Sequence, residues 1–120
     1  MGGLKNPKKK QSPANELTNK IINFLILNGY RAWRNNAVGI FDPKTKRFRK
    51  QPKNGNQGTS DVLGFHKKTA RFVAVEIKIG SDELSESQIE FLDTVEKAGG
   101  IAIEAKTFDG FLKSIKEQNG

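Results

Sequence analysis

The chain has 120 residues and a mass of 13.3 kDa, which leaves room for one domain with its own core and not for a second. It has no Cys and a single His, so disulfides, thiolate metal sites and His-rich metal clusters are excluded. The formal net charge of +8 favours a polyanionic partner, while 35% hydrophobic residues indicate a folded domain. Because no apolar run approaches the roughly 20 residues that span a bilayer and no apolar signal segment opens the chain, we expect a cytoplasmic protein without a membrane partner.

The positive charge is concentrated in the first half of the chain. Residues 1–56 carry 13 Lys and Arg against two acids, whereas residues 57–120 carry 8 against 11. We therefore expect the nucleic-acid contact surface in the first half. Its candidate phosphate-binding cations are Lys8, Lys9, Lys10, Arg31, Arg34, Arg47, Arg49, Lys50 and Lys53. For the lysines of residues 1–13 a solubilising tail is an equally good interpretation.

The N-terminal half predicts one helix and two short strands. Residues 1–13 are expected to form a flexible basic arm, and residues 14–120 a single domain. Ser12-Pro13 is typical of a helix start, and apolar residues at helical spacing continue to a stop at Asn28-Gly29. Strands are predicted at residues 30–35 and 37–41, followed by a polar loop over residues 42–58.

The C-terminal half predicts a hairpin and then a βαβ unit. Residues 59–65 and 71–79 read as antiparallel strands joined by a tight turn. Ser85-Glu86-Ser87-Gln88 matches a capping box and predicts a helix that ends before Gly99-Gly100. A strand at residues 101–105 and a helix at residues 109–116 complete the chain. The strands at residues 71–79 and 101–105 lie before and after the helix that ends at Gly99-Gly100, so they must be parallel, with a right-handed crossover. This arrangement is typical of an α/β protein.

Two acids fall in the predicted hairpin, where a sheet does not tolerate an unpaired carboxylate. Asp61 precedes an apolar pair, and Glu76 is embedded in an apolar strand. Alternation along that strand places Ala74, Glu76 and Lys78 on one face. Because an unpartnered buried polar group costs on the order of 2–7 kcal/mol, a buried Glu76 requires a partner, and a divalent cation would supply one.

A cation held here would be Mg²⁺ or a similar ion, since Mg²⁺ binds one or two carboxylates plus water and substrate phosphate. Asp61 and Glu76 are the candidate ligands, with the backbone carbonyl of Ile77 as a third. Lys78 is a candidate to activate the attacking water and to screen charge on the phosphate. The alternative is an ordinary ion pair of Glu76 and Lys78 on a solvated face. The apolar strand, the nearby Asp61 and the basic surface favour the metal site.

Two further residues have both a structural and a catalytic interpretation. The capping box already explains Gln88, although a helix start aimed at the site would let its side chain hold Lys78 or a water. Glu16 is typical of an acid in the first turn of a helix, where it interacts with the helix dipole, but it could also reach the metal. Both alternatives stay open.

The ordered set of these residues resembles the PD-(D/E)xK nuclease superfamily, and within it the VRR-NUC group and the related Holliday junction resolvases. The similarity covers most of residues 14–105. Its matching segments are Gly58-Thr59-Ser60-Asp61-Val62-Leu63-Gly64, Val75-Glu76-Ile77-Lys78, Leu84-Ser85-Glu86-Ser87-Gln88 with Phe91-Leu92, and Ala98-Gly99-Gly100. Ser60 replaces the Pro of the motif, and the region from Phe41 to Gly58 is longer and more basic than a minimal core needs.

The resemblance implies a restriction-endonuclease-like α-β-β-β-α-β core with a central mixed sheet flanked by helices. It also implies that Asp61 and Glu76 bind Mg²⁺ or Mn²⁺, that Lys78 assists the water, and that Gln88 and Glu16 support the site. The activity it implies is a metal-dependent DNA endonuclease selective for branched DNA such as Holliday junctions. Small members of this type are often phage proteins and homodimers.

Two other functions are alternatives to this one. A non-catalytic nucleic-acid binding module with the same fold would be expected to lose the Asp and E-x-K set, which is intact here. A small basic RNA-associated or ribosomal protein would account for the charge but not for a buried Glu76 beside Lys78.

Overall fold

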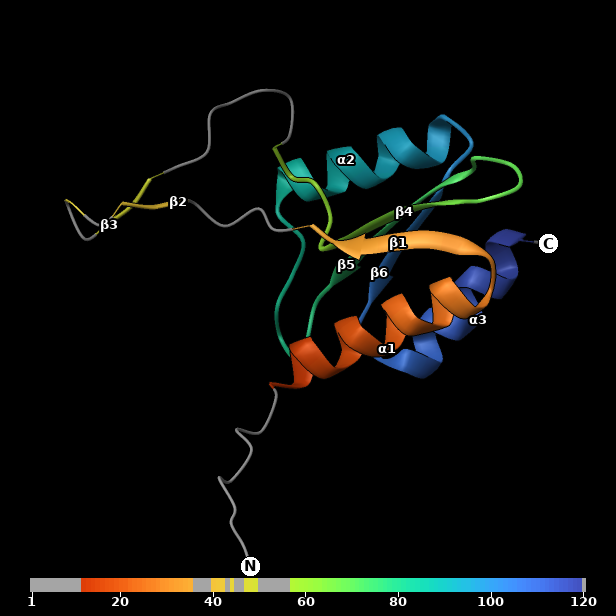
Figure 1. The fold of residues 1–120 in the computed structure, drawn as a ribbon, viewed down its shortest axis with the longest axis horizontal. Coiled ribbons are helices and arrows are strands. Elements are labelled where there is room, and N and C mark those ends of the chain that lie inside the picture. Colours follow the sequence, from red (N-terminus) through yellow and green to blue (C-terminus); the bar gives the residue numbers. More distant parts are fainter. Residues whose placement is uncertain (1–11, 36–39, 43, 45–46, 50–56, 120) are drawn as a thin grey trace, which may run out of the picture.

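The computed structural model describes residues 12–35, 40–42, 44, 47–49 and 57–119. Along the described segments one helix is followed by five strands, and then by a helix, a strand and a final helix (Figure 1). They are α1 (Pro13–Leu27), β1 (Tyr30–Arg34), β2 (Ile40–Asp42), β3 (Arg47–Arg49), β4 (Val62–His66), β5 (Phe72–Ile77), α2 (Glu86–Lys97), β6 (Ile101–Ala105) and α3 (Phe108–Asn119). Within these described segments, no helix combines the length and the apolar character needed to cross a membrane.

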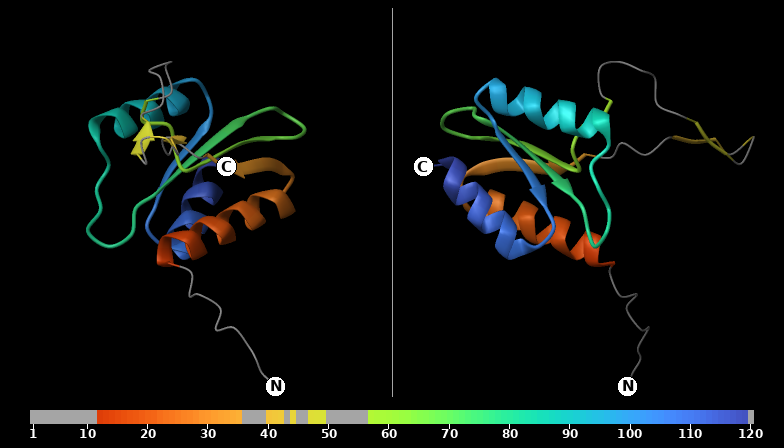
Figure 2. Two further views of the ribbon diagram at one scale, coloured as in Figure 1. Left: turned by 60° about the vertical axis from the view of Figure 1, so that its left-hand side comes forward. Right: turned by 180° about the vertical axis from the view of Figure 1, so that it is seen from behind.

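Four strands form the central sheet in the order β1-β4-β5-β6. The β1/β4 and β4/β5 pairs are antiparallel, and β5 and β6 are parallel, joined by α2. The expected mixed sheet and the expected parallel strand pair are thus confirmed. One face of the sheet carries α2 and the opposite face carries α1 and α3, as the views of Figures 1 and 2 agree. The chain therefore has the predicted restriction-endonuclease-like α/β fold.

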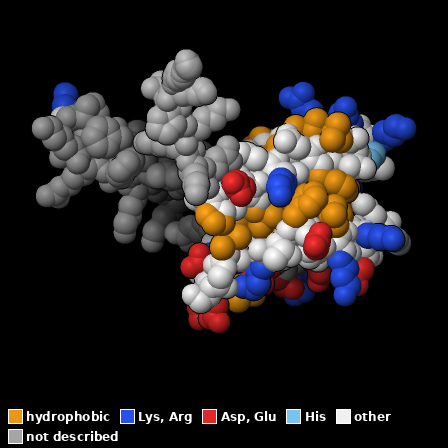
Figure 3. Space-filling model, turned by 90° about the horizontal axis from the view of Figure 1, so that it is seen from below, with side chains coloured by type: hydrophobic (Ala, Val, Ile, Leu, Met, Phe, Trp, Pro, Cys, Tyr) orange, Lys and Arg blue, Asp and Glu red, His pale blue; other side chains and the backbone are white. Residues whose placement is uncertain are grey.

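The apolar core lies between the sheet and the two helices α1 and α3. Ser12 caps α1, where its Oγ accepts a hydrogen bond of 3.1 Å from the backbone N–H of Asn15. The core side chains are Leu17, Ile21, Leu25, Tyr30, Val62, Val73, Val75, Ile77, Ile101, Ile103, Ala105, Phe111 and Ile115. The outer surface of α1 and α3 carries acids and bases side by side, as Figure 3 shows from below. That surface lacks the uniform positive charge expected of a contact with DNA.

The prediction of a continuous loop over residues 42–58 is wrong, because β3 lies within it. β3 pairs with β2 as a separate antiparallel ribbon, with Phe41 opposite Phe48 and Asp42 opposite Arg47. Arg47-Phe48-Arg49 alternates cations with an aromatic residue, which is a strand pattern that the flanking Lys, Pro and Gly residues obscured. The predicted strand over 37–41 is described only from Ile40 onward.

The hairpin strands are shorter than predicted, and this changes where two site residues lie. β4 begins at Val62, so Asp61 belongs to the segment that leads into the strand. β5 ends at Ile77, so Lys78 follows the strand. Both residues therefore lie where the regular β4/β5 ladder ends, and side chains can replace backbone partners there.

Candidate active site

Asp61 and Glu76 lie across from each other at the end of the β4/β5 hairpin. The last ladder pair is Val62 with Val75, and the next step of the antiparallel register brings Asp61 opposite Glu76. Asp61 Oδ2 accepts a hydrogen bond of 2.8 Å from the backbone N–H of Ile77. The side chain of Asp61 thus takes the place of a strand partner for β5 and is fixed beside Glu76.

Asn35, which follows β1, holds the segment that carries Asp61. Its backbone N–H donates to the carbonyl oxygen of Asp61 at 2.7 Å. Its side-chain Nδ2 donates to Thr59 Oγ1 at 2.9 Å and to the Ser60 carbonyl oxygen at 3.1 Å. Sequence reasoning missed this role, and the only signal was a polar amide at the end of a predicted strand.

Glu76 is almost completely buried, with 2% of its surface exposed. Its Oε1 accepts a hydrogen bond of 3.1 Å from Gln88 Nε2. Its Oε2 is also buried, and it has no hydrogen-bond partner among the residues that the structure describes. A carboxylate oxygen in this position is costly unless a proton or a cation satisfies it.

The side-chain amide of Gln88 bonds with its oxygen to the start of α2 and with its nitrogen to Glu76. Its Oε1 accepts from the backbone N–H of Ser85 at 2.8 Å, and its own N–H donates to Ser85 Oγ at 3.2 Å, which completes the capping box. The amide Nε2 remains for Glu76. The two interpretations of Gln88 are therefore compatible, although its partner is Glu76 and not Lys78.

The loop before Asp61 packs directly on the start of α2. Gly58 has a φ of +71°, and a Cβ added there would clash with the carbonyl oxygen of Ser87. Only glycine fits both requirements, so Gly58 allows the segment before Asp61 to contact the helix that carries Gln88.

The pKa of Glu76 is raised to about 8, first by burial and then by the adjacent Asp61 carboxyl, which favours the protonated form and repels a charge on Glu76. Glu104, its neighbour on β6, adds a smaller rise, while the positive charge of Lys78 lowers the pKa. Glu76 therefore keeps its proton at neutral pH when no cation is bound. A bound divalent cation would offset both the burial of the carboxylate and its repulsion by Asp61, which are the causes of the raised pKa.

The backbone of β5 directs the next two residues to opposite sides. Because the N–H of Ile77 points toward Asp61, its C=O points to the same side, as the expected third ligand requires. The N–H of Lys78 bonds to the carbonyl oxygen of Ala105 on β6 at 3.0 Å. The half-buried Lys78 side chain makes no ion pair with Glu76 among the described residues, so the simple ion-pair interpretation is not supported.

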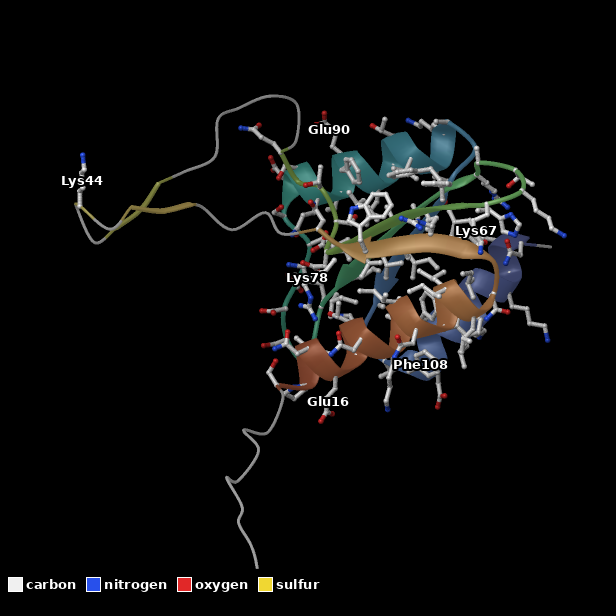
Figure 4. The ribbon with its side chains drawn as sticks, viewed as in Figure 1. Glu16, Lys44, Lys67, Lys78, Glu90 and Phe108 are labelled. Atoms are coloured by element: carbon white, nitrogen blue, oxygen red, sulfur yellow. The ribbon has the colours of Figure 1, made fainter. Side chains whose placement is uncertain are left out.

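Glu16 is not brought to this pair. It lies exposed in the first turn of α1, and Figure 4 shows its side chain pointing away from the sheet and from Lys78. Its side chain has no hydrogen bond or ion pair within the described part of the chain. The geometry fits the interpretation of Glu16 as a first-turn acid.

The expected basic surface is only partly described. Arg31 is exposed on β1, whereas Arg34 donates to Asn15 Oδ1 at 3.1 Å and to Asn19 Oδ1 at 3.3 Å, which ties it to α1. Arg47 and Arg49 belong to β3. The remaining candidates, Lys8, Lys9, Lys10, Lys50 and Lys53, lie outside the described residues.

The residues present fit an all-oxygen metal site of low carboxylate count. No cluster of three or more His, Cys, Asp or Glu side chains occurs in the described segments. Mg²⁺ needs only one or two protein carboxylates, because water and phosphate complete its shell. Asp61 and Glu76 with the Ile77 carbonyl meet that requirement, and the unpartnered Glu76 Oε2 is the atom that a cation would satisfy.

Comparison with known proteins gives one match. Neither the curated proteins nor the solved structures contain a significant match to this chain. The family model of the VRR-NUC domain matches residues 16–109, a range that includes Asp61, Glu76, Lys78 and Gln88. Since this range covers most of the 120 residues, the chain belongs to the VRR-NUC family and carries a nuclease-type domain.

Proposed function

We propose that this protein is a Mg²⁺- or Mn²⁺-dependent endodeoxyribonuclease that cleaves phosphodiester bonds in branched DNA such as Holliday junctions. The observation that carries the proposal is the buried carboxylate of Glu76. One of its oxygens has no partner among the described residues, and Asp61 lies beside it. A buried acid pair of this kind is destabilising by itself and becomes favourable when it binds a divalent cation.

The site residues would divide the work as follows. Asp61 and Glu76 would each supply a carboxylate oxygen to the metal ion, and the backbone carbonyl of Ile77 would supply a third ligand. When bound, Mg²⁺ acts as a Lewis acid that lowers the pKa of a water and offsets charge on the scissile phosphate. Gln88 holds Glu76 Oε1 and so fixes the direction of the free oxygen. Lys78, half-buried next to the pair, places a positive charge where the phosphate charge increases during hydrolysis.

Cleavage of a labelled DNA panel tests this function. Four-way junctions, flaps, nicked duplex, linear duplex and single strands are incubated with the protein in Mg²⁺, in Ca²⁺ and in EDTA. We expect cutting in Mg²⁺ and Mn²⁺, binding with little cutting in Ca²⁺ because its looser geometry misplaces the water, and no cutting in EDTA. Full cleavage in excess EDTA would overturn the proposal. Binding without cleavage in every metal would favour the non-catalytic DNA-binding module.

We also propose that two copies act together on a branched substrate. The support is the resemblance to small dimeric resolvases and the two-fold character of a four-way junction. Light scattering of the free protein and of its junction complex measures the copy number. A single copy in both states would contradict this part of the proposal.

A further inference from the structure

The face of the sheet that carries Asp61 and Glu76 is only half covered. α2 packs on β5 and β6, while the β1 and β4 side of the same face extends beyond it (Figures 1 and 2). The strand register places three aromatic residues on this open part of the face, one each on β1, β4 and the neighbouring β5. Phe65 lies opposite Phe72 on β5 and opposite Arg31 on β1, and Trp33 lies opposite Leu63. We call Trp33, Phe65 and Phe72 the aromatic stripe.

The stripe is open to solvent. Trp33 is 44% exposed, Phe65 38% and Phe72 36%. The rings of Trp33 and Phe65 meet edge to face with their centres 6.4 Å apart. Contiguous exposed aromatic surface of this kind marks a binding site more often than isolated apolar residues do.

The stripe is continuous with the catalytic pair. Asp61, Leu63 and Phe65 follow one another at alternate positions, so they lie on one face in a line. At about 3.3 Å per residue, Phe65 lies about 13 Å from Asp61 along β4. A DNA strand with its phosphate at Asp61 would therefore place its next bases over the stripe.

The charge around the stripe suits a polyanion. Arg31 is exposed on the same face beside Phe65, and the turn after β4 presents the exposed Lys67 and Lys68, of which Lys67 is labelled in Figure 4. Glu90 on α2 points away from the sheet in the same view. The acids that the register places on this face of the sheet are Asp61, Glu76 and, on the far strand β6, Glu104. The first two belong to the metal site.

We infer that the aromatic stripe stacks the unpaired bases of a DNA strand next to the scissile phosphate. Within branched DNA, the substrate class would then be a flap or another branch with a single-stranded segment at the cut, rather than a fully paired four-way junction or continuous duplex. Aromatic faces stack on any base, and flanking cations hold the backbone, which is the usual arrangement for single strands. A second copy of the chain fits less well, because pairing the stripe with itself would bring Arg31, Lys67 and Lys68 of both copies into one interface. The inference that the stacked bases lie next to the cut rests on the proposed nuclease function, whereas the stacking on the aromatic stripe does not.

Trp33 is the single tryptophan of the chain, so its fluorescence reports on the stripe directly. The full chain is titrated with a short oligodeoxythymidine and with a blunt duplex of equal length, in Ca²⁺ to prevent cutting. We expect quenching of Trp33 by the single strand at concentrations where the duplex leaves the emission unchanged.

Two substitutions of an exposed ring test the stacking separately. Phe65→Ala and Phe65→Leu should each weaken single-strand binding about 5- to 150-fold, because Leu keeps apolar area but loses the ring face. Ile89→Ala is the matched control, since Ile89 is a 53% exposed apolar residue on α2 outside the stripe. Fluorescence anisotropy of labelled DNA measures these affinities, with circular dichroism as the check on folding.

Three results would overturn the inference. They are an unchanged Trp33 emission at saturating single strand, a Phe65→Leu variant that binds like the wild type, and an emission change that follows protein concentration without DNA. The last result would assign the stripe to a second copy. Because these measurements need no cleavage, a failed nuclease assay with intact stacking would remove the proposed function alone.

Discussion

On one face of β5, Val73, Val75 and Ile77 pack into the apolar core beneath α1 and α3. On the opposite face, Ala74 lies beside Glu76, a carboxylate as buried as the core residues but with an oxygen that has no partner in the described part of the chain. Alternate residues of one strand thus build a stabilising surface and a destabilising one. The free energy gained on the first face allows the second to hold a carboxylate in a position that favours function over stability.

The difference between the two faces also appears in how each is supported. The core face depends on shape, since its side chains fill the space between sheet and helices. The acid face depends on single hydrogen bonds, from Ile77 to Asp61, from Gln88 to Glu76 and from Asn35 to the segment before β4. Substitutions on the core face should therefore change stability, and substitutions on the acid face should change chemistry.

The largest effect is expected on the acid face. Asp61→Asn, Glu76→Gln and Lys78→Ala should each lower cleavage by at least about 100-fold, because the first two remove a metal-binding carboxylate and the third removes the cation beside the phosphate. Single-turnover cleavage of the best substrate measures the loss. Glu104→Gln is the matched control, since Glu104 is aligned with Glu76 on β6 but contacts Lys106 at 3.7 Å. Wild-type turnover by any of the first three variants would contradict the site.

A pair of neighbouring residues on β6 tests the contrast in stability. Ile103 is buried in the core at 2% exposure, and Glu104 follows it on the other face. Ile103→Ala should lower the free energy of unfolding by about 2–5 kcal/mol, whereas Glu104→Ala should change it by about 0.5 kcal/mol or less. Urea unfolding of the metal-free proteins measures both. Equal decreases in the free energy of unfolding would show that the two faces of the sheet contribute equally to stability.

The raised pKa of Glu76 predicts an unusual pH dependence of stability. Its ordinary pKa of 4.5 applies to the unfolded chain, and its pKa in the folded protein is about 8. Between these values the folded state holds a proton that the unfolded state has released, so stability decreases as pH rises through this window. The slope due to this group is at most about 1.4 kcal/mol per pH unit.

Unfolding in EDTA at pH 5, 6.5 and 8 checks this dependence. Glu76→Gln should flatten the decrease and be more stable than the wild type at the highest pH. Because a cation must displace the same proton, metal affinity should rise with pH over this window. Parallel pH profiles for the wild type and the variant would refute the assignment of the slope to Glu76.

Both the apolar face of β5 and the pair of Asp61 and Glu76 could be predicted from the sequence, because both depend on local patterns. Alternation of side chains in β5 and the positions of the two acids in a predicted hairpin can be read without knowledge of the fold. The parallel pairing of β5 with β6 followed from the helix between them. The structure confirms the α/β fold that the predicted βαβ unit implied.

What the sequence did not predict depends on contacts between distant segments. Asn35 holds the segment from Thr59 to Asp61 through three hydrogen bonds, yet as one of two consecutive Asn residues it resembles any loop residue. The hydrogen bond from Gln88 to Glu76 is not predictable from the sequence, because the direction of a side chain from α2 depends on how Gly58 packs against the helix. β3 is also missed, since a three-residue strand surrounded by Lys and Pro has little signal of its own.

A smaller effect is expected at Gln88, whose amide serves two partners. Gln88→Ala should weaken metal binding about 10- to 100-fold, because it leaves both oxygens of the Glu76 carboxylate without a protein partner. Ser85→Ala removes the hydroxyl that caps α2 but leaves the Glu76 contact, so it should lower stability by about 1 kcal/mol and leave metal affinity unchanged. Calorimetric titration with Mn²⁺ measures the affinities. Similar affinities for both variants would show that Gln88 acts only through the cap.

The smallest effect is expected at Glu16, and it decides whether the site extends to α1. Glu16 is exposed and directed away from Asp61 and Glu76, so Glu16→Gln should leave cleavage unchanged. It should lower stability by about 0.3–1 kcal/mol, the usual contribution of an acid at a helix N-terminus, and added salt should diminish that loss. Cleavage rates and urea unfolding at low and high salt separate the two roles. If cleavage instead fell as far as in Asp61→Asn, Glu16 would have to reach the substrate complex from α1, and the acid face would extend across both sides of the sheet.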